Sequence, residues 1–202
     1  LRDIVDLPDE GIVLSDGTRL SARIWRPTDA ETYPVPVILE YLPYRKRDGT
    51  CARDALTHPY FAARGYACLL VDFRGNGDSY GLMEDEYTKQ ELADAEEVIA
   101  WAAAQPWCNG NVGMMGISWG GFNSLQVAAR QPDALKAIIT LCSTVDRFAD
   151  DIHYKGGCLL NENMGWGATM WSYSSRPPDP ALRKDWREMW LERLDAEPFL
   201  PV

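Results

Sequence analysis

The segment around Ser118 constrains the fold more than any other part of the chain. An apolar run at residues 112–117 leads into Gly-Ile-Ser-Trp-Gly at 116–120, and a helical pattern continues to residue 131. A strand, a Gly-x-Ser-x-Gly turn and a helix in this order are typical of a nucleophile elbow, whose tight turn needs neighbours without bulky side chains. The alternative is a glycine-rich turn with a bystander serine. The elbow predicts that the Ser118 hydroxyl stands exposed at the carboxyl end of a sheet.

Strand-like and helical patterns alternate along the middle of the chain. Residues 66–72 form a continuous apolar run, which is typical of a strand buried on both faces, and residues 135–142 form another. Residues 88–105 have helical periodicity and begin with a capping box, Thr88 and Glu91. Such alternation predicts an α/β fold with a mostly parallel sheet and helices on both of its faces.

The start of the chain has the pattern of antiparallel strands. Apolar residues at 12–14 and 20–25 flank a Ser-Asp-Gly-Thr sequence at 15–18. The Asp-Gly pair predicts a two-residue type I′ hairpin turn. A third apolar run follows at residues 35–42. We expect the hairpin to form an antiparallel edge of the sheet.

The pattern changes in the last third of the chain. Residues 146–175 are rich in Gly, Trp, Met and Asn, and an Arg-Pro-Pro-Asp-Pro linker follows at 176–180. Residues 182–194 are again amphipathic, but neither segment adds a strand to the alternation. We therefore expect two parts, a core at residues 1–145 that carries the elbow and a helical cap segment at residues 146–202.

The chain is acidic, with a formal net charge of -10 over 202 residues. Nucleic acids and anionic membrane surfaces both select basic faces, so neither is an expected partner. No stretch approaches the ~18 apolar residues of a membrane span, and the first ten residues carry four acidic groups and no apolar run. The five cysteines show no Cys-x-x-Cys spacing, which favours reduced thiols in a cytoplasmic protein.

An acyl-transfer site also needs hydrogen-bond donors for the oxyanion. In an elbow, one donor is the backbone N–H of the residue after the nucleophile, here Trp119. The other comes from the loop after the third strand, where Tyr44 follows Pro43 and the His-Gly-Gly-Gly form of that loop is absent. The Tyr44 hydroxyl is a candidate for this second donor. The alternative is an ordinary strand-end tyrosine whose ring packs.

Three motifs of this chain occur together in a known family. They are Pro43-Tyr44 with the polar run after it, Asp-Phe-Arg-Gly-Asn-Gly-Asp-Ser-Tyr-Gly at 72–81, and the elbow with an aromatic residue after its serine. The combination resembles the family of cocaine esterase, X-Pro dipeptidyl-peptidase and α-amino-acid ester hydrolase. This resemblance implies an α/β-hydrolase fold, Ser118 as the nucleophile, and an oxyanion hole made by the Tyr44 hydroxyl and the Trp119 N–H.

The resemblance also implies roles around these residues. Arg74 would hold the loop after the fourth strand without touching substrate. Trp166 and Trp171 could line an acyl pocket, or they could pack as the core of the cap. No cofactor is implied, because acyl transfer by a serine needs none. No metal site is expected either, since the chain has only two histidines.

The base that activates the serine is the point where this chain departs from the family. The family places its Asp and His after the cap, and the histidines here are His58 and His153. A triad of Ser118, Asp146 and His153 is one alternative. The other is a chain truncated before its Asp and His, which would expose a parallel strand edge and favour self-association or pairing with a complementary chain.

These observations favour a serine hydrolase that cleaves an ester, an amide or a short X-Pro peptide through an acyl-enzyme on Ser118. A second hypothesis is a non-catalytic, hydrolase-like fragment that acts as an interaction unit. A remote third is a nucleotide-binding module, because Gly75 and Gly77 follow a strand. Gly81 breaks the Gly-x-Gly-x-x-Gly spacing, and the next helix is expected only at about Thr88, which argues against that module.

Overall fold

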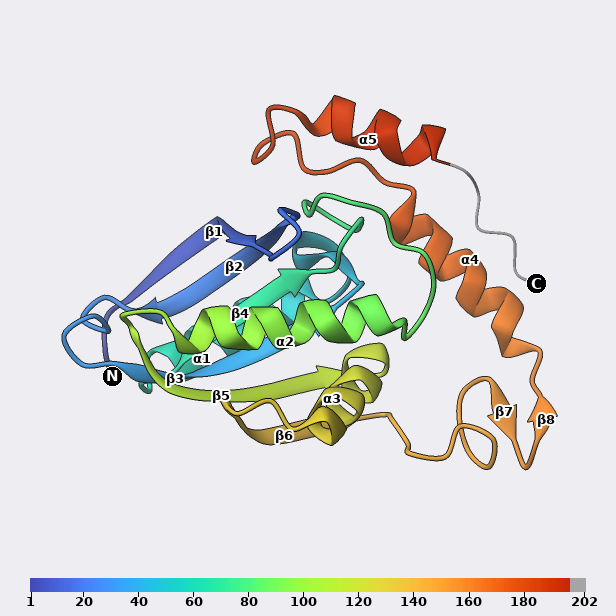
Figure 1. Ribbon diagram of the computed structural model, residues 1–202, viewed down its shortest axis with the longest axis horizontal. Coiled ribbons are helices and arrows are strands. Elements are labelled where there is room, and N and C mark those ends of the chain that lie inside the picture. The colour runs from blue at the N-terminus through green and yellow to red at the C-terminus, as the bar shows by residue number, and fades with distance from the viewer. Residues whose placement is uncertain (197–202) are drawn as a thin grey trace.

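The computed structural model describes residues 1–196, most of which surround one six-stranded sheet (Figure 1). The strands are β1 (Ile4–Val13), β2 (Arg19–Pro27), β3 (Val35–Leu42), β4 (Ala67–Asp72), β5 (Cys108–Ile117) and β6 (Leu135–Leu141). They lie in the order β1-β2-β4-β3-β5-β6. The β1–β2 and β2–β4 pairs are antiparallel, whereas β3–β4, β3–β5 and β5–β6 are parallel. The predicted mixed, mostly parallel sheet with an antiparallel hairpin at its edge is confirmed.

Helices cover both faces of this sheet. They are α1 (Cys51–Ala62), α2 (Lys89–Ala103) and α3 (Trp119–Arg130), and two further helices, α4 (Glu162–Ser174) and α5 (Trp186–Asp195), lie in the segment that extends beyond the sheet. Successive side chains of a strand point to opposite faces. Glu40 of β3 bonds to Arg53 of α1. The ring of Tyr41 packs on Phe73, which contacts Trp119 of α3. Helix α1 therefore covers one face, and α2 and α3 cover the other, in front of the sheet in Figure 1.

The centre of the sheet sets the position of the candidate site. All six residues of β4 are buried, as its continuous apolar run predicts, and Leu69, Leu70 and Val71 have no exposed surface. Strands β3 and β5 are parallel neighbours, so their carboxyl ends meet at one edge of the sheet. The residues that follow Leu42 therefore lie beside those that follow Ile117.

The turn of the N-terminal hairpin differs from the prediction. A type I′ turn needs a positive φ at two central residues, but in this turn only Gly17 has one, at 88°. The Gly17 N–H donates to the Leu14 carbonyl, and the Leu14 N–H donates to the Thr18 carbonyl, both at 2.9 Å. Asp16 Oδ1 accepts the Thr18 N–H at 2.8 Å. The side chain of Asp16 thus stabilises a longer turn that requires glycine at one position only.

Helix α1 was not expected from the sequence. It contains Pro59, which the rules for helices place at a break. His58 lies inside α1 with no exposed surface, stacked on Trp25 with ring centroids 4.8 Å apart.

The predicted helix at residues 88–105 is confirmed as α2. Thr88 caps it, since its side chain accepts the Glu91 N–H at 3.1 Å. Glu91 returns a bond to the N–H of Tyr87 at 2.9 Å, one residue earlier than in a standard capping box.

Residues 146–196 leave the sheet and extend past its carboxyl edge (Figure 1). They form a small hairpin, β7 (Tyr154–Lys155) and β8 (Cys158–Leu159), followed by α4 and α5. The last predicted helix begins at Trp186, four residues later than the start of the amphipathic pattern at Leu182. The division of the chain at residue 145 into core and cap remains a prediction.

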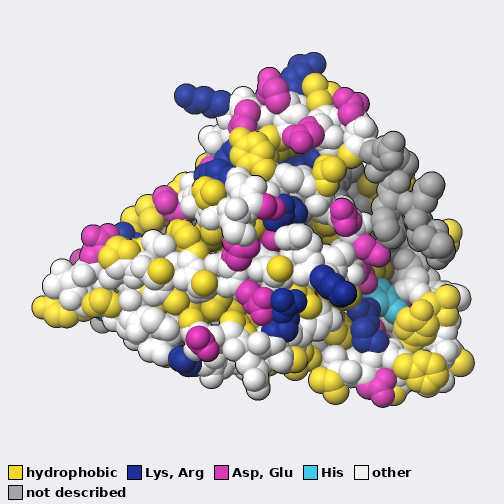
Figure 2. All heavy atoms as spheres, in the orientation of Figure 1, with side chains coloured by type: hydrophobic (Ala, Val, Ile, Leu, Met, Phe, Trp, Pro, Cys, Tyr) yellow, Lys and Arg dark blue, Asp and Glu magenta, His cyan; other side chains and the backbone are white. Residues whose placement is uncertain are grey.

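Acidic and basic side chains are interspersed on the face shown in Figure 2. Many of the acidic groups pair with arginines, as Asp6 does with Arg23 and Glu96 with Arg130. None of the helices within residues 1–196 has both the length and the apolar character that a membrane span requires.

Candidate active site

The elbow at Ser118 is formed as the sequence predicts. Ser118 lies between the end of β5 and the start of α3 with φ 53° and ψ -116°, a combination that L residues rarely adopt. Its N–H donates to the Leu141 carbonyl of β6 at 2.8 Å, and its carbonyl accepts the N–H groups of Gly121 and Phe122. A Cβ on Gly116 would lie 2.4 Å from the backbone of Gly120, so this turn excludes any side chain there.

The Trp119 side chain fixes the first turn of α3. The indole is buried, and its Nε1–H donates to Glu91 Oε1 at 3.0 Å. Asn123 Nδ2 donates to the same oxygen at 3.3 Å and to the Tyr41 carbonyl at 2.8 Å. Burial raises the pKa of Glu91 to about 7, although the Trp119 and Asn123 donors act against the rise. Sequence analysis gave Glu91 only a capping role, because nothing local indicates that it also reaches α3.

Tyr44 lies directly beside the nucleophile. The Trp119 N–H donates to the Tyr44 hydroxyl oxygen at 3.1 Å, and the Ser118 side chain is near enough to oppose the rise in the pKa of Tyr44. Burial raises the pKa of Tyr44, so its phenol keeps its proton at neutral pH. The structure thus brings the predicted nucleophile and both predicted oxyanion donors to one point. An oxyanion that entered between the two donors would replace the bond that they now make to each other.

The loop after β4 is bonded to α2 and to the N-terminal hairpin through Arg74. Arg74 donates to Asp94 of α2 at 2.8 Å through two nitrogens, and it also bonds to Asp16 and Thr18 of the hairpin. A Cβ on Gly77, whose φ is 53°, would lie 2.1 Å from the Asp72 carboxylate. The loop therefore wraps around a carboxylate, which gives no support to a phosphate-binding turn.

Two cavities flank the elbow. One of about 360 Å³ is lined by Ser118, Phe122 and Cys142 of the core, and by residues at the start of the cap segment that include Asp151. A larger one of about 620 Å³ lies between Trp119 and helix α4.

The two cap tryptophans differ in position. Trp166 lines the larger cavity, contacts the Tyr44 ring edge-on at 6.2 Å and donates to Glu86 at 2.9 Å. Trp171 is 76% exposed and lines neither cavity.

Comparison with known proteins places this arrangement in a family. The family model of X-Pro dipeptidyl-peptidase (S15 family) matches residues 16–201. The chain belongs to the S15 family. Cocaine esterase from Rhodococcus sp. (strain MB1 Bresler) is 36% identical over 163 residues, which cover 78% of this chain and 27% of that protein. A putative Xaa-Pro dipeptidyl-peptidase from Streptomyces avermitilis is 28% identical over 203 residues, covering 79% of this chain and 29% of that protein.

Solved structures confirm the α/β-hydrolase fold. A CocE/NonD family hydrolase from Staphylococcus aureus matches 94% of this chain and 36% of its own, with a TM-score of 0.71 and 25% identity. An α-amino acid ester hydrolase matches 86% of this chain and 31% of its own, with a TM-score of 0.69 and 23% identity. This S15-family chain thus spans only about a third or less of the relatives described here.

The histidines of this S15-family chain do not reach Ser118. His153 Nδ1 bonds to Asn163 Oδ1, and its Nε2 lies 3.9 Å from a Glu86 carboxylate oxygen. Asp146 Oδ1 accepts the N–H groups at residues 148 and 149. The structure therefore does not assemble the alternative triad of Ser118, Asp146 and His153. Within residues 1–196, no hydrogen bond joins the Ser118 hydroxyl to a histidine.

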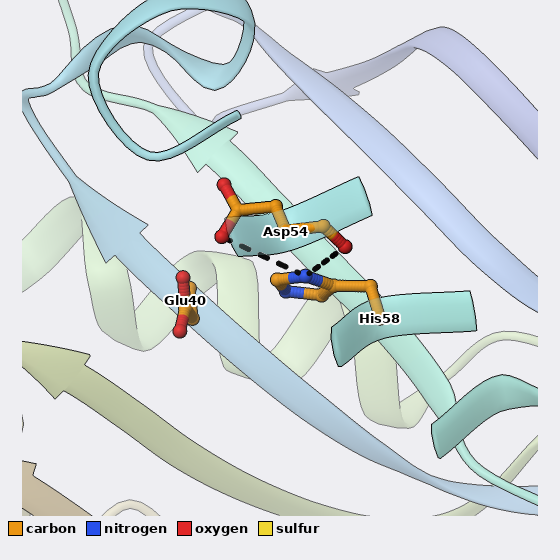
Figure 3. A group of neighbouring side chains, drawn as sticks. All are labelled: Glu40, Asp54 and His58. Carbon is orange, nitrogen blue, oxygen red and sulfur yellow. Dashed lines mark hydrogen bonds and ion pairs between the residues drawn. The ribbon is translucent and has the colours of Figure 1, made fainter. Parts of the chain in front are cut away.

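Within the described part of the S15-family chain, one group of side chains has the spacing of a metal site. Glu40, Asp54 and His58 offer ligand atoms within 4.8 Å of one another (Figure 3). Arg53 bonds to both carboxylates, at 2.7 Å to Asp54 Oδ1. The guanidinium already supplies the positive charge that these carboxylates need, and the cluster lies on the α1 face of the sheet. It is best described as a buried ion cluster that fastens α1 to β3.

Glu40→Gln is expected to flatten the pH dependence of stability. Burial raises the pKa of Glu40 from 4.5 to about 7, against the opposing charge of Arg53. A carboxyl whose pKa is raised by folding destabilises the native state progressively as pH increases from about 4.5 to about 7. The wild-type chain should therefore lose on the order of 3 kcal/mol through Glu40 over this range, and the glutamine variant should not.

Urea unfolding at pH 5 and pH 8 measures this difference. Glu96→Gln, which alters a partly exposed ion pair with Arg130, is the control and should follow the wild type. Parallel pH profiles for wild type and Glu40→Gln would show that Glu40 does not titrate in this range.

Proposed function

We propose that this chain carries the nucleophile and oxyanion hole of a serine hydrolase that acts on esters or amides. The observation that supports this is the convergence of the Ser118 hydroxyl, the Tyr44 hydroxyl and the Trp119 N–H at the strained elbow. Membership of a hydrolase family, whose relatives include esterases and Xaa-Pro dipeptidyl-peptidases, supports the reaction type.

In the proposed mechanism, Ser118 Oγ attacks the substrate carbonyl and its proton passes to a general base. The carbonyl oxygen becomes an oxyanion and accepts hydrogen bonds from the Tyr44 hydroxyl and the Trp119 N–H. The tetrahedral intermediate collapses, the alcohol or amine leaves with a proton, and an acyl-enzyme remains on Ser118. Water then releases the acid and regenerates the serine.

We place the base and its acidic partner outside residues 1–202, either in further chain or in a partner chain. The placement of the histidines supports this. His153 is bonded to Asn163, and His58 is buried in the α1 cluster. The edge strand β6, with Ile139 61% exposed and Leu141 53% exposed, supports association with such a chain or with a second copy.

The acyl pocket and the cellular location remain parts of the proposal. The position of Trp166 over Tyr44 supports a pocket wall, whereas the exposed Trp171 gains no support from the geometry. The five cysteines are unpaired, which fits a reducing, cytoplasmic setting.

Intact-mass spectrometry with a fluorophosphonate probe tests the function. A form of the protein that contains the base should gain one adduct, and Ser118→Ala in the same form should gain none. Ser143→Ala is the matched control, because Ser143 lines the same cavity and should not be needed for labelling.

If the 22.7 kDa chain does not react, a product of the same gene that extends beyond residue 202 is tested in the same way. Labelling at Ser118 in the longer product supports the proposal and places the base outside these 202 residues. Absence of labelling in both would contradict it and favour the non-catalytic fragment.

A further inference from the structure

The backbone at Tyr44 and Arg45 has an unfavourable conformation. Tyr44 has φ -85° and ψ 8°, and Arg45 has φ 63°, a left-handed conformation that favours glycine. The pair opens a single π-helical turn, Arg45–Gly49, immediately after β3. Such a backbone persists only where its surroundings hold it. The contacts of Arg45 and Lys46 show what holds it here.

Lys46 anchors the turn to the core. Its side chain is fully buried, and Nζ donates to Ser21 Oγ at 2.6 Å, to Asp78 Oδ2, and to Asp72 Oδ2 at 3.4 Å. Its backbone N–H also donates to Asp72 Oδ1 at 2.7 Å. The ammonium group and the main chain of Lys46 are thus bonded to β2, to the last residue of β4 and to the loop after it.

Arg45 anchors the same turn to the cap. It is buried, and its guanidinium donates to the carbonyls of Arg176 at 3.0 Å and Pro177 at 2.7 Å, with a longer contact of 3.4 Å to that of Tyr173. Its Nε donates to Asp48 at 2.6 Å. The three carbonyls belong to the end of α4 and the residues after it, where a cation is favoured by the helix dipole.

The cap also meets this turn through other groups. The rings of Trp166 and Tyr173, both on α4, pack on the Tyr44 ring with centroids 6.2 Å away. The Asp179 N–H donates to Asp78 at 2.7 Å, so the segment after α4 bonds to a carboxylate that also binds Lys46. The position of the Tyr44 side chain is therefore fixed by contacts to the core and by contacts to α4.

We propose that Arg45 is a positioning residue that makes the oxyanion hole depend on the docking of α4. It fixes Tyr44 only while the carbonyls at residues 173–177 are within reach. Because α4 also lines the larger cavity, a substrate that displaces α4 would move the Tyr44 hydroxyl away from the Trp119 N–H. This inference rests on the proposed function, since it treats Tyr44 as an oxyanion donor.

The first test follows the Tyr44 hydroxyl without requiring activity. 3-Fluorotyrosine is placed at position 44 of this chain, and its fluorine NMR resonance is recorded in the parent, Arg45→Ala, Arg45→Lys and Arg187→Ala. Arg45→Lys keeps the charge and the stem but loses the planar fork that bonds several carbonyls.

Both Arg45 variants should shift or broaden the resonance, with the larger change in Arg45→Ala. Arg187→Ala is the control and should not, because Arg187 is an exposed arginine on α5 that takes no part in the contacts described above for Tyr44 and Arg45. An unchanged resonance in Arg45→Ala would overturn the proposal.

The second test separates positioning from general destabilisation. The rate of fluorophosphonate labelling at Ser118 is measured for Arg45→Ala, Tyr44→Phe and the double variant, in whichever form of the protein reacts. Arg45→Ala alone should slow labelling about 10-fold, and it should have no further effect in the Tyr44→Phe background.

Equal slowing by Arg45→Ala in both backgrounds would mean that Arg45 acts independently of Tyr44, which would overturn the proposal. If no form of the protein reacts at Ser118, the proposed function fails. The fluorine measurement then still decides whether Arg45 positions Tyr44.

Discussion

Gly116→Ala is expected to slow the reaction of Ser118 with a fluorophosphonate by about 10³-fold. The added Cβ would lie 2.4 Å from the Gly120 carbonyl carbon and 2.5 Å from its oxygen. Both are backbone atoms at the start of α3, so the clash is relieved only if the elbow opens. Opening the elbow displaces Ser118 Oγ and the Trp119 N–H together, which removes the nucleophile and an oxyanion donor from their places.

Gly113→Ala is the matched control in the same strand. Its Cβ would lie 3.5 Å from the nearest atom, the Ala137 carbonyl oxygen, which is an ordinary contact. That variant should react at the wild-type rate and unfold at the wild-type temperature. Wild-type labelling of Gly116→Ala would contradict the elbow geometry.

Lys46→Met should lower the free energy of unfolding by about 3–5 kcal/mol, because it leaves two buried carboxylates without their counter-ion. Asp72 is 1% exposed and Asp78 is 3% exposed. Burial already raises the pKa of Asp72, and the Lys46 ammonium is the main charge that opposes the rise. Removing it raises the pKa of Asp72 further, so the variant should be less destabilised at pH 5 than at pH 8.

Urea unfolding at the two pH values measures this effect. Lys136→Met is the control, because Lys136 is exposed and its ammonium bonds to the Asp133 carbonyl. It should change stability by less than about 0.5 kcal/mol. A Lys46→Met chain as stable as the control would show that the buried carboxylates are compensated in another way.

The features that sequence analysis predicted depend on residues close together in the chain. The elbow needs Gly116, Ser118 and Gly120 in one short segment, and the burial of β4 follows from its own six residues. Tyr44 was a candidate oxyanion donor from its place after the third strand, and the resemblance favoured that role. The structure puts its hydroxyl in contact with the Trp119 N–H, and the role stays a prediction.

The features that it missed depend on residues far apart. A lysine in the polar run after Tyr44 has the pattern of a solvated side chain, and Lys46 is buried only because Asp72 and Asp78 lie 26 and 32 residues further along. The second role of Glu91 depends on Trp119, 28 residues away. Helix α1 was missed because Pro59 and a buried histidine contradict the usual local pattern.

The strand order also determines when the site can form as the chain folds. The central strand β3 pairs with β4 and with β5, which begins only at Cys108. The loop between β3 and β5 must close before their contacts are gained, so a sheet of this topology folds slowly. During synthesis, one edge of β3 stays unpaired until the ribosome has passed Ile117. The nucleophile, Ser118, is the next residue. Its reactive geometry can therefore form only after β5 has paired with β3 at the centre of the sheet.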